Sequence, residues 1–467
     1  MSRSSPNLAA KPADTPNPDR MSALEWRVGT SLAAIFGLRM LGLFLVLPVF
    51  SVFASGLPGG DNFQLVSLAF GAFMLVQAFL YVPFGFASDR FGRKPVIVAG
   101  LLIFAAGSAM AAWAPNIYWM IAARALQGMG AVSAAVTALA SDLTREQHRT
   151  KVMALIGSTI GLAFSLSLVV SPMLYAWIGM RGMFLLIALL ALLAIPLLLR
   201  VVPSPTHAPV ARERVPVTEV LKDAQLLRLN FGIFALHVLQ TAMFLVVPHQ
   251  LIAQHGLALG QHWYVYLPVV LGSFVVAIPA IMQSERKGRT KLMFVASIGV
   301  LLISQLGLWL GTASLANVVV MLLLFFAAFN VLEASLPALV SRIAPSRAKG
   351  TALGIFNTTQ ALGVAAGSAA GGWIAVHLGA HWINAMTVAL ALAWGLIALS
   401  MKVPARLTVK TVTLGPNANM DLMRERIASL PGVREVAMER ERGIATLKIN
   451  PERWDESRLQ RLIGGEA

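Results

Sequence analysis

The sequence predicts an all-α membrane protein made of two six-helix bundles, followed by a small α+β domain. Three observations lead to this prediction. Of the 467 residues, 57% are hydrophobic and only 12% are charged, with a mean hydropathy of +0.72, whereas soluble domains carry about 25% charged residues. Twelve apolar runs are long enough to cross a bilayer, which takes about 20 helical residues. After residue 401 these runs stop, and short segments with strand and helix periodicity follow.

The twelve runs divide evenly around a polar linker. In chain order they cover 28–54, 62–87, 95–113, 117–141, 152–177, 182–200, 229–253, 263–283, 292–311, 316–341, 351–378 and 382–401. The predicted domains are a tail at 1–27, a first bundle at 28–200, a linker at 201–228, a second bundle at 229–401 and a soluble domain at 402–467. This organisation is not that of a soluble enzyme, and no enzymatic activity is expected.

Positive charges give the chain its predicted orientation. It carries 37 Lys and Arg against 21 Asp and Glu, a formal net charge of +16. Of the 37, 22 fall in the N-terminal tail and the even-numbered loops, and Arg181 is the single one in an odd-numbered loop. Because Lys and Arg favour cytoplasmic loops, both termini are predicted to be cytoplasmic. These charges are spread over short loops, which argues against a nucleic-acid partner and leaves the lipid bilayer as the expected one.

The absence of cysteine limits the chemistry of the chain. With no Cys in the sequence, disulfides, thiolate catalysis, iron–sulfur clusters and Cys-based metal sites are excluded. We expect no cofactor and no metal site.

The polar segments outside the runs suggest a tail and an interfacial helix. Residues 1–20 are rich in Ser, Pro, Asn and Asp and lack the apolar core of a signal peptide, so a disordered tail is predicted. Residues 201–209 form an extended, Pro-containing stretch. Apolar residues then recur at helical spacing at Val217, Val220, Leu221, Ala224 and Leu227. They predict one amphipathic helix on the cytoplasmic membrane interface.

The second half of the chain repeats the first with an offset near 200 residues. Equivalent features are Phe44 and Phe244, Pro48 and Pro248, Pro83 and Pro279, Ser141 and Ser341, and the segments 89–93 and 285–289. Two parallel repeats of this kind are typical of transporters that bind their substrate between two rocking bundles. Alternating access is therefore the expected mechanism.

Motifs in the first half resemble those of a known family. Residues 85–94, Gly-Phe-Ala-Ser-Asp-Arg-Phe-Gly-Arg-Lys, resemble motif A of the major facilitator superfamily, and residues 124–130, Arg-Ala-Leu-Gln-Gly-Met-Gly, resemble its motif B. Residues 42–48 are similar to the first-helix motif of the drug:proton antiporter branch. The segments 24–27, 39–42 and 330–337 and the soluble tail resemble YajR-type transporters. This likeness covers nearly the whole chain and implies a monomeric transporter of the bacterial inner membrane.

One stretch departs from the antiporter pattern. In that branch the fifth helix carries a Gly-Pro pair followed by paired glycines, whereas here Ser171-Pro172 is followed by Met, Leu, Tyr and Ala. The eleventh run has a closer version, with Gly363, Gly367, Gly371 and Gly372. Antiport is thus supported by fewer residues than membership of the superfamily.

Motif A implies a gate. In the family it forms a latch on the cytoplasmic side, a role that falls here on Gly85, Asp89, Arg90, Gly92, Arg93 and Lys94. The expected partner of Asp89 is the start of the eleventh helix near Gly350 and Thr351, where the helix dipole favours a carboxylate. An ordinary positively charged turn is the alternative. Asp142 is expected to pair with Arg93 or Arg149, either as part of the latch or as a surface ion pair.

Glu333 is the only acidic residue well inside a predicted span. An ionised carboxylate there costs several kcal/mol, so it should be protonated, paired or exposed to a water-filled cavity. We expect it to carry the coupling proton, with a static acid beside Asn330 as the alternative.

Two cations and several polar residues complete the candidate site. Arg39 is expected to pair with Glu333 or with an anionic substrate. The resemblance implicates Arg124, with Gln127 and Gly128 of motif B, in proton transfer, and a link from the fourth span to backbone carbonyls is the alternative. The candidate residues of the substrate cavity are Gln77, His237, Gln240 and Asn330, with core packing as the alternative for each.

The soluble tail has the element order of a ferredoxin-like domain. The pattern predicts a strand at 407–414, a helix at 419–430, a hairpin of 433–439 and 444–449, and a helix at 456–463. It resembles heavy-metal-associated domains, but the loop at 415–419 that would bind the metal has no thiol. The tail is therefore expected either to regulate or dock, or to stabilise the chain passively.

The expected function is proton-driven export of a small amphipathic or drug-like solute. Two alternatives stay open, namely import or facilitated diffusion of a metabolite and ligand sensing without net flux. The expected partners are a small-molecule substrate, protons and the bilayer.

Overall fold

A computed structural model describes residues 21–204, 217–286, 288–311, 313–344, 348–401, 408–414, 420–439, 443–449 and 454–464. The described residues form two compact units. One lies within Met1–Pro279 and Phe294–Ser400, and the other within Ala280–Met293 and Met401–Ala467.

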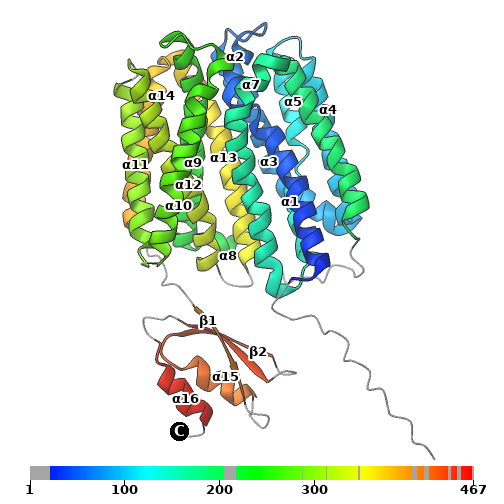
Figure 1. Cartoon of the computed structure of the whole chain (residues 1–467), viewed down its shortest axis with the longest axis vertical. Coiled ribbons are helices and arrows are strands. Elements are labelled where there is room, and N and C mark those ends of the chain that lie inside the picture. The colour runs from blue at the N-terminus through cyan, green and yellow to red at the C-terminus, as the bar shows by residue number, and fades with distance from the viewer. Residues whose placement is uncertain are drawn as a thin grey trace, which may run out of the picture. The chain divides into compact units, whose positions relative to one another are not determined.

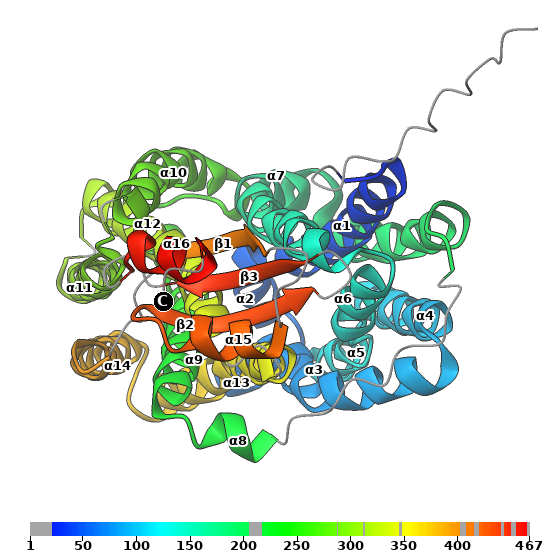
Figure 2. The same cartoon turned by 90° about the horizontal axis from the view of Figure 1, so that it is seen from below.

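The first half of the helical region begins with α1 and ends with α7. Its helices are α1 (Ala23–Phe44), α2 (Leu47–Ser55), α3 (Phe63–Phe91), α4 (Arg93–Ala112), α5 (Ile117–Gly128), α6 (Ser133–Asp142) and α7 (Glu146–Val201). The second half holds α8 (Val217–Leu221), α9 (Ala224–Ala253), the 3₁₀ turn η1 (Leu259–Gln261), α10 (Trp263–Arg286), α11 (Thr290–Leu310), α12 (Leu315–Ile343), α13 (Lys349–His377) and α14 (His381–Leu399). The long helices stand side by side (Figure 1). Seen end-on, α3 to α6 gather on one side and α9 to α12 with α14 on the other (Figure 2).

Nine helical stretches within the described residues are long and apolar enough to cross a membrane. Three differences separate them from the twelve predicted runs. The fourth run is two short helices, α5 and α6, separated by residues 129–132. The fifth and sixth runs lie within α7, where Gly179 has non-helical backbone angles (φ 63°, ψ 177°). The eleventh run, α13, is 29 residues long but is not among the nine, so the twelve-span topology stays a prediction.

Side chains at the helix starts explain several boundaries. Ser22 and Glu25 form a capping box at α1, because each side chain binds the other's backbone N–H. Asn62 and Asn116 cap α3 and α5. Both have extended backbone angles, and their side chains accept hydrogen bonds from backbone N–H groups of the first turn. At the α3–α4 turn, Gly92 has a φ of 93°, which disfavours any residue with a Cβ.

The single amphipathic helix predicted across residues 217–227 is wrong. The short helix α8 ends at Leu221, and α9 begins at Ala224. Asp223 lies between them, and its carboxylate accepts hydrogen bonds from the backbone N–H groups of Gln225 and Leu226. A carboxylate in this position starts a new helix, so the apolar periodicity on either side belongs to two elements.

The two halves pack tightly along α3 and α13. A Cβ at Gly71 would lie 2.7 Å from the Cβ of Ser368, and one at Gly372 would lie 2.6 Å from the Cβ of Ser67. Such distances are shorter than van der Waals contact, so glycine at these positions allows the helices to approach.

The second unit contains a three-stranded antiparallel sheet. Its elements are β1 (Thr408–Thr413), α15 (Met420–Ala428), β2 (Val433–Glu439), β3 (Ile444–Ile449) and α16 (Glu456–Gly464), and the strand order is β1-β3-β2. Leu414, Ile427, Leu447 and Leu459 are buried together in its core. The order of elements agrees with the sequence pattern, while the thiol-free loop at 415–419 lies outside the described residues.

Candidate functional site

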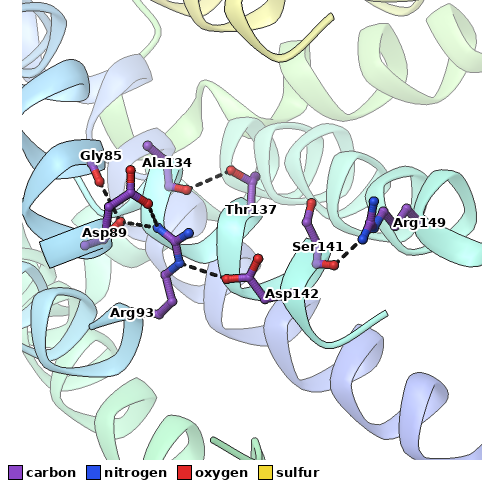
Figure 3. Close-up of polar contacts among 9 residues, drawn as sticks. Gly85, Asp89, Arg93, Ala134, Thr137, Ser141, Asp142 and Arg149 are labelled. Carbon is purple, nitrogen blue, oxygen red and sulfur yellow. Dashed lines mark hydrogen bonds and ion pairs between the residues drawn. The ribbon is translucent and has the colours of Figure 1, made fainter. Parts of the chain in front are cut away.

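Arg93, the first residue of α4, lies at the α3–α4 turn and binds two carboxylates. Its Nη1 donates to Asp89 Oδ1 at 2.5 Å and to Ser88 Oγ at 2.8 Å, and its Nε donates to Asp142 Oδ2 at 2.9 Å (Figure 3). Arg149 instead donates to the backbone oxygen of Ser141. Of the two partners predicted for Asp142, the one found is therefore Arg93, and the contact joins the α3–α4 turn to the end of α6.

The remaining motif A residues surround this pair. Lys94 Nζ donates to the backbone oxygen of Val202 at 2.5 Å, just beyond the end of α7. The guanidinium of Arg90 lies 5.3 Å from the ring centre of Phe91, while a Cβ at Gly85 would meet nothing within 4 Å. The partner expected for Asp89 at the start of α13 stays a prediction. We call the end of the helical region that carries this turn the motif end, and the opposite end the far end.

Arg39 and Arg124 are enclosed within the first half. Arg39 is 1% exposed and donates to Ser133 Oγ and to the backbone oxygen of Gly130, each at 3.2 Å. The Arg39–Glu333 pair offered as one possibility is not present in the described structure, where the guanidinium binds the Gly130 carbonyl between α5 and α6, which also accepts from the Val132 N–H. The other predicted partner, an anionic substrate, stays a prediction.

Arg124 joins α5 to α4 through its neighbour in motif B. It donates to Gln127 Oε1 at 2.8 Å, and Gln127 Nε2 donates to Ser108 Oγ at 2.7 Å. The guanidinium also lies 5.1 and 5.5 Å from the ring centres of Phe73 and Phe50, at cation–π distance. A Cβ at Gly128 would collide with the backbone oxygen of Phe73. Within the described residues, the motif B side chains therefore stay inside the first half.

Glu333 has an incomplete set of partners. Its side chain is 34% exposed, although it lies mid-way along the apolar helix α12. Oε1 accepts a hydrogen bond from Gln360 Nε2 at 3.1 Å. Oε2 is inaccessible to solvent and has no hydrogen-bond partner in the described structure, and His237 Nε2 lies 4.0 Å from it. A carboxylate at this depth with a free oxygen is able to take up a proton or bind a cationic group.

Of the four predicted cavity residues, His237 is the one with a contact to Glu333 in the described structure. Its Nε2 is 2.8 Å from Gln360 Nε2, a residue that the sequence analysis missed. Asn330 donates instead to Ser273 Oγ on α10 at 3.1 Å. Gln240 and Gln77 are 7% and 1% exposed, and Gln77 belongs to the first half. The signal for Gln360 was an amide three residues before Gly363 in an apolar run that also contains Asn357, which on its own does not distinguish a site from packing.

A group of aromatic rings, the phenylalanine cluster, connects the two halves beside Glu333. It consists of Phe164 on α7, Phe244 on α9, and Phe326 and Phe329 on α12. The Phe164 ring centre lies 6.4, 6.0 and 5.7 Å from those of Phe244, Phe326 and Phe329. Phe329 also lies 6.0 Å from the His237 ring. The cluster therefore places aromatic contacts between the halves next to the Glu333 site.

Polar contacts between the halves gather at the far end. Ser51 Oγ donates to the backbone oxygen of Phe244 at 3.0 Å, and Ser55 Oγ lies 3.4 Å from His249 Nε2. A Cβ at Gly260 would lie 2.7 Å from the Cβ of Ala176. The glycine that permits this approach is on η1, opposite the α7 stretch that lacks the antiporter glycines.

Glycines toward the motif end have open surroundings. A Cβ at Gly85, Gly157, Gly161, Gly350 or Gly354 would meet no atom within 4 Å outside its own helix and neighbours. These five glycines lie on α3, α7 and α13, while Gly29 and Gly37 of α1 are in contact with Val152 and Thr159 of α7. An apolar cavity of about 400 Å³ lies between α3, α9 and α13, but it is not lined by Glu333, His237, Gln240 or Asn330.

Two packed helical halves with a partly exposed carboxylate inside an apolar helix are the features that the comparison with known families has to match. The sequence model of the family described as "Major Facilitator Superfamily" matches residues 31–368 and 231–440 of this chain. The chain belongs to this superfamily and is a multi-pass membrane transporter.

Relatives and solved structures extend the likeness over most of the chain. The inner membrane transport protein YajR of Escherichia coli (strain K12) is 39% identical over 96% of this chain and 99% of that relative. The multidrug resistance protein MdtH of Yersinia enterocolitica is 30% identical over 72% of this chain and 84% of that relative. In fold, the chain is similar to the crystal structure of the human organic anion transporter MFSD10 (TETRAN), with a TM-score of 0.61 and 20% identity over 81% of this chain and all of that one. It is also similar to a bacterial homologue of the human lysosomal transporter Spinster in an inward-facing and occupied conformation, with a TM-score of 0.63 and 12% identity over 81% of this chain and 97% of that one.

Proposed function

We propose that this protein exports a small amphipathic or drug-like solute across the bacterial inner membrane in exchange for protons. The observation that carries this proposal is Glu333, a partly exposed carboxylate inside an apolar helix, with one oxygen that lacks a hydrogen bond. Such a group binds a proton or a cationic substrate, and competition between the two is the simplest basis for exchange. The name of the MdtH relatives as multidrug resistance proteins supports this choice of substrate class.

In this proposal the structure represents an inward-facing arrangement of an alternating-access cycle. Contacts between the halves at the far end and the open surroundings of the glycines at the motif end support it. The Spinster homologue, described in inward-facing conformations, has the same fold. The motif end is then cytoplasmic, as are both termini, and the chain crosses the membrane twelve times. The distribution of Lys and Arg supports this orientation.

The motif A residues act as the cytoplasmic gate. In the inward-facing state Arg93 holds both Asp89 and Asp142 within the first half. In the outward-facing state Asp89 turns to the N-terminus of α13, where backbone N–H groups and the helix dipole favour an anion. Exchange between these two sets of partners would make closure reversible, because neither arrangement leaves a carboxylate unpaired.

The C-terminal region is proposed to be a ferredoxin-like domain with a regulatory or docking role. The strand order β1-β3-β2 with two helices supports the assignment. Because the chain has no cysteine, the domain would not deliver soft metal ions.

Flux measurements in proteoliposomes test the function. Purified full-length protein is reconstituted, and a panel of fluorescent amphipathic solutes is screened with and without an imposed pH gradient. Movement of a solute against its own gradient, driven by the proton gradient, is the expected result. Equilibration that ignores the pH gradient would instead identify a facilitator or importer. Saturable binding without flux would identify a sensor.

A further inference from the structure

A group of polar side chains with incomplete hydrogen bonding lies at the far end of the second half, where η1 joins α9 to α10. Within the described structure, buried side-chain atoms without a hydrogen-bond partner include Gln250 Oε1, His255 Nε2, His262 Nδ1 and Tyr266 Oη. His262 and Tyr266 are both 0% exposed. Histidine changes its charge between about pH 5 and 8, so His262 combines complete burial with a charge that responds to ordinary acidity.

The contacts of His262 fit a neutral ring. Its Nε2 lies 3.3 Å from the backbone oxygen of Leu257, which only accepts, so Nε2 carries the ring proton. Its Nδ1 has no hydrogen-bond partner in the described structure. A second proton on Nδ1 would create a buried positive charge without an acceptor, which is far more costly than an unpaired neutral group. The closed far end therefore disfavours a protonated His262.

His262 lies beside the contact between the two halves. It directly follows η1, and the Gly260 of that turn packs against α7 of the first half, where an added Cβ would lie 2.7 Å from the Cβ of Ala176. The segment that contains the enclosed ring is thus the segment that joins the halves at this end.

A second histidine of this end touches the first half directly. His249 on α9 has its Nε2 3.4 Å from Ser55 Oγ on α2, and its ring centre lies 5.6 Å from that of Phe63 on α3. His249 and His262 are within electrostatic range of each other. Because like charges repel, a proton on one ring makes a proton on the other less favourable. The closed far end therefore does not accommodate both charges.

We propose that His262 is a proton-binding site whose occupation opens the far end of the transporter. In the closed arrangement the ring is neutral and enclosed. The ring takes up a proton from the far side when η1 and the start of α10 move away from α7 and the imidazole reaches water. Protonation then shifts the equilibrium toward separation of the halves at this end, because the proton binds that conformation better. The inference rests on the proposed alternating access and adds a proton site separate from Glu333.

Few other titratable or charged groups belong to the elements around His262. They are His249 on α9, His255 in the turn after it, Tyr264 and Tyr266 on α10, Tyr175 and Arg181 on α7, and Asp61 between α2 and α3. Asp61 is exposed, and the ion pairs found among the described residues involve none of these groups. Tyrosine, arginine and aspartate ordinarily change charge well outside the histidine range. Proton uptake at this end near neutral pH therefore falls on the histidines.

The test measures a distance across the far end at different pH values. Because the chain has no cysteine, two introduced cysteines, at the exposed positions Gln64 and Gln254, carry spin labels on the first and second halves of the full-length protein in lipid nanodiscs. Acidification through the range of about pH 8 to 5 in which histidine changes charge should favour the longer distance. The ratio of separated to closed populations should rise by up to about tenfold per pH unit, the limit for one proton.

Three variants decide whether His262 is responsible. His262→Phe keeps an enclosed ring that cannot take a proton, so the far end should stay closed throughout the pH range. His262→Gln is a second neutral variant, which keeps the test valid if the Phe variant does not fold. His381→Phe makes the same change at a histidine that contacts Trp309 instead, and it should leave the response to pH unchanged. No acid-induced separation in the unaltered protein, or an undiminished one in a folded neutral variant of His262, would overturn the inference.

The distances need no substrate, so they separate this inference from the proposed function. The measurement is repeated in Glu333→Gln, where the response to pH should persist. If it disappears there and persists in His262→Phe, the inference fails and the proposed coupling at Glu333 stands. If the response depends on His262 while solute accumulation ignores the pH gradient, the inference stands and the proposed antiport fails.

Discussion

The two halves of the helical region differ in how far the charged side chains inside them are exposed. In the first half, Arg39 and Arg124 are 1% and 3% exposed, and each donates hydrogen bonds within its own half. All three side chains leave one buried atom without a hydrogen bond, Nε in each arginine and Oε2 in Glu333, but Glu333 in the second half is 34% exposed. A charge whose partners are fixed on the same rigid unit stabilises that unit. A carboxylate that is partly exposed beside the contact between the halves has capacity for a ligand or a proton.

The largest expected effect is that of Glu333→Gln, which removes the charge of Glu333 in the second half. We expect a loss of roughly 5- to 150-fold in the accumulation ratio driven by a pH gradient, the range of typical coupling free energies of about 1–3 kcal/mol. Solute binding and thermal stability should persist, because the amide keeps the shape of the carboxyl. Measured accumulation in proteoliposomes, with Glu333→Asp as a variant that retains the acid, checks this. Unchanged accumulation and pH dependence in Glu333→Gln would make Glu333 a structural acid.

Arg124→Met tests the other side of the comparison. It leaves Gln127 Oε1 without its buried donor, which should lower the free energy of unfolding by about 1–3 kcal/mol. The measurement is thermal unfolding in detergent alongside the pH dependence of transport. A stable variant with an altered pH dependence would show that the arginine of the first half takes part in proton movement after all.

Asp89→Asn probes an acid that is neither enclosed nor unpaired. Its ion pair with Arg93 becomes a hydrogen bond from the guanidinium to a neutral amide oxygen, and the proposed dipole interaction with α13 weakens by about 0.3–1 kcal/mol. Transport should fall several-fold while folding and insertion are retained. Transport rates and size-exclusion profiles of the variant are the readouts, and normal rates would remove Asp89 from the gate.

Gly260→Ala sharpens the contrast between the two ends. The new methyl group would lie 2.7 Å from the Cβ of Ala176, and such overpacking costs about 1–3 kcal/mol. The population should shift toward separation of the halves at the far end. Because the chain has no cysteine, spin labels on introduced cysteine pairs measure this without background. Gly157→Ala, which meets nothing within 4 Å, is the matched control, and an identical response of both variants would contradict the packing account.

Removal of residues 404–467 should have the smallest effect. The first unit holds most of the helical region, and only residues 280–293 of that region group with the tail. The truncated protein should insert and stay monodisperse in mild detergent. Aggregation would show that the tail is an integral part of the fold.

The parts that the sequence predicted are those set by local pattern. Apolar runs predicted most of the helices, and the alternation after residue 402 predicted the three strands. The pairing of Arg93 with Asp142 was one of two partners that loop charges allowed. Asp223 shows the limit of periodicity, because a single capping carboxylate divides one apolar pattern into α8 and α9.

The parts that were missed depend on which helices converge. Gln360, His237 and Glu333 are far apart in the sequence, and only the packing of α9, α12 and α13 brings their side chains together. Arg39 was expected to reach Glu333 or a substrate because its sequence neighbourhood does not show the break between α5 and α6. At that break the Gly130 carbonyl accepts from both the Val132 N–H and the guanidinium.

The contact between Gly260 and Ala176 has a consequence for how such proteins diverge. The space between η1 and α7 accommodates a single methyl group. Either the η1 position or the α7 position can supply that methyl group. Selection then acts on the combined volume of two residues rather than on either alone. Among relatives, a glycine on α7 should be accompanied by a larger residue at the η1 position and the reverse, so that a search confined to one helix would overlook the compensated sequences.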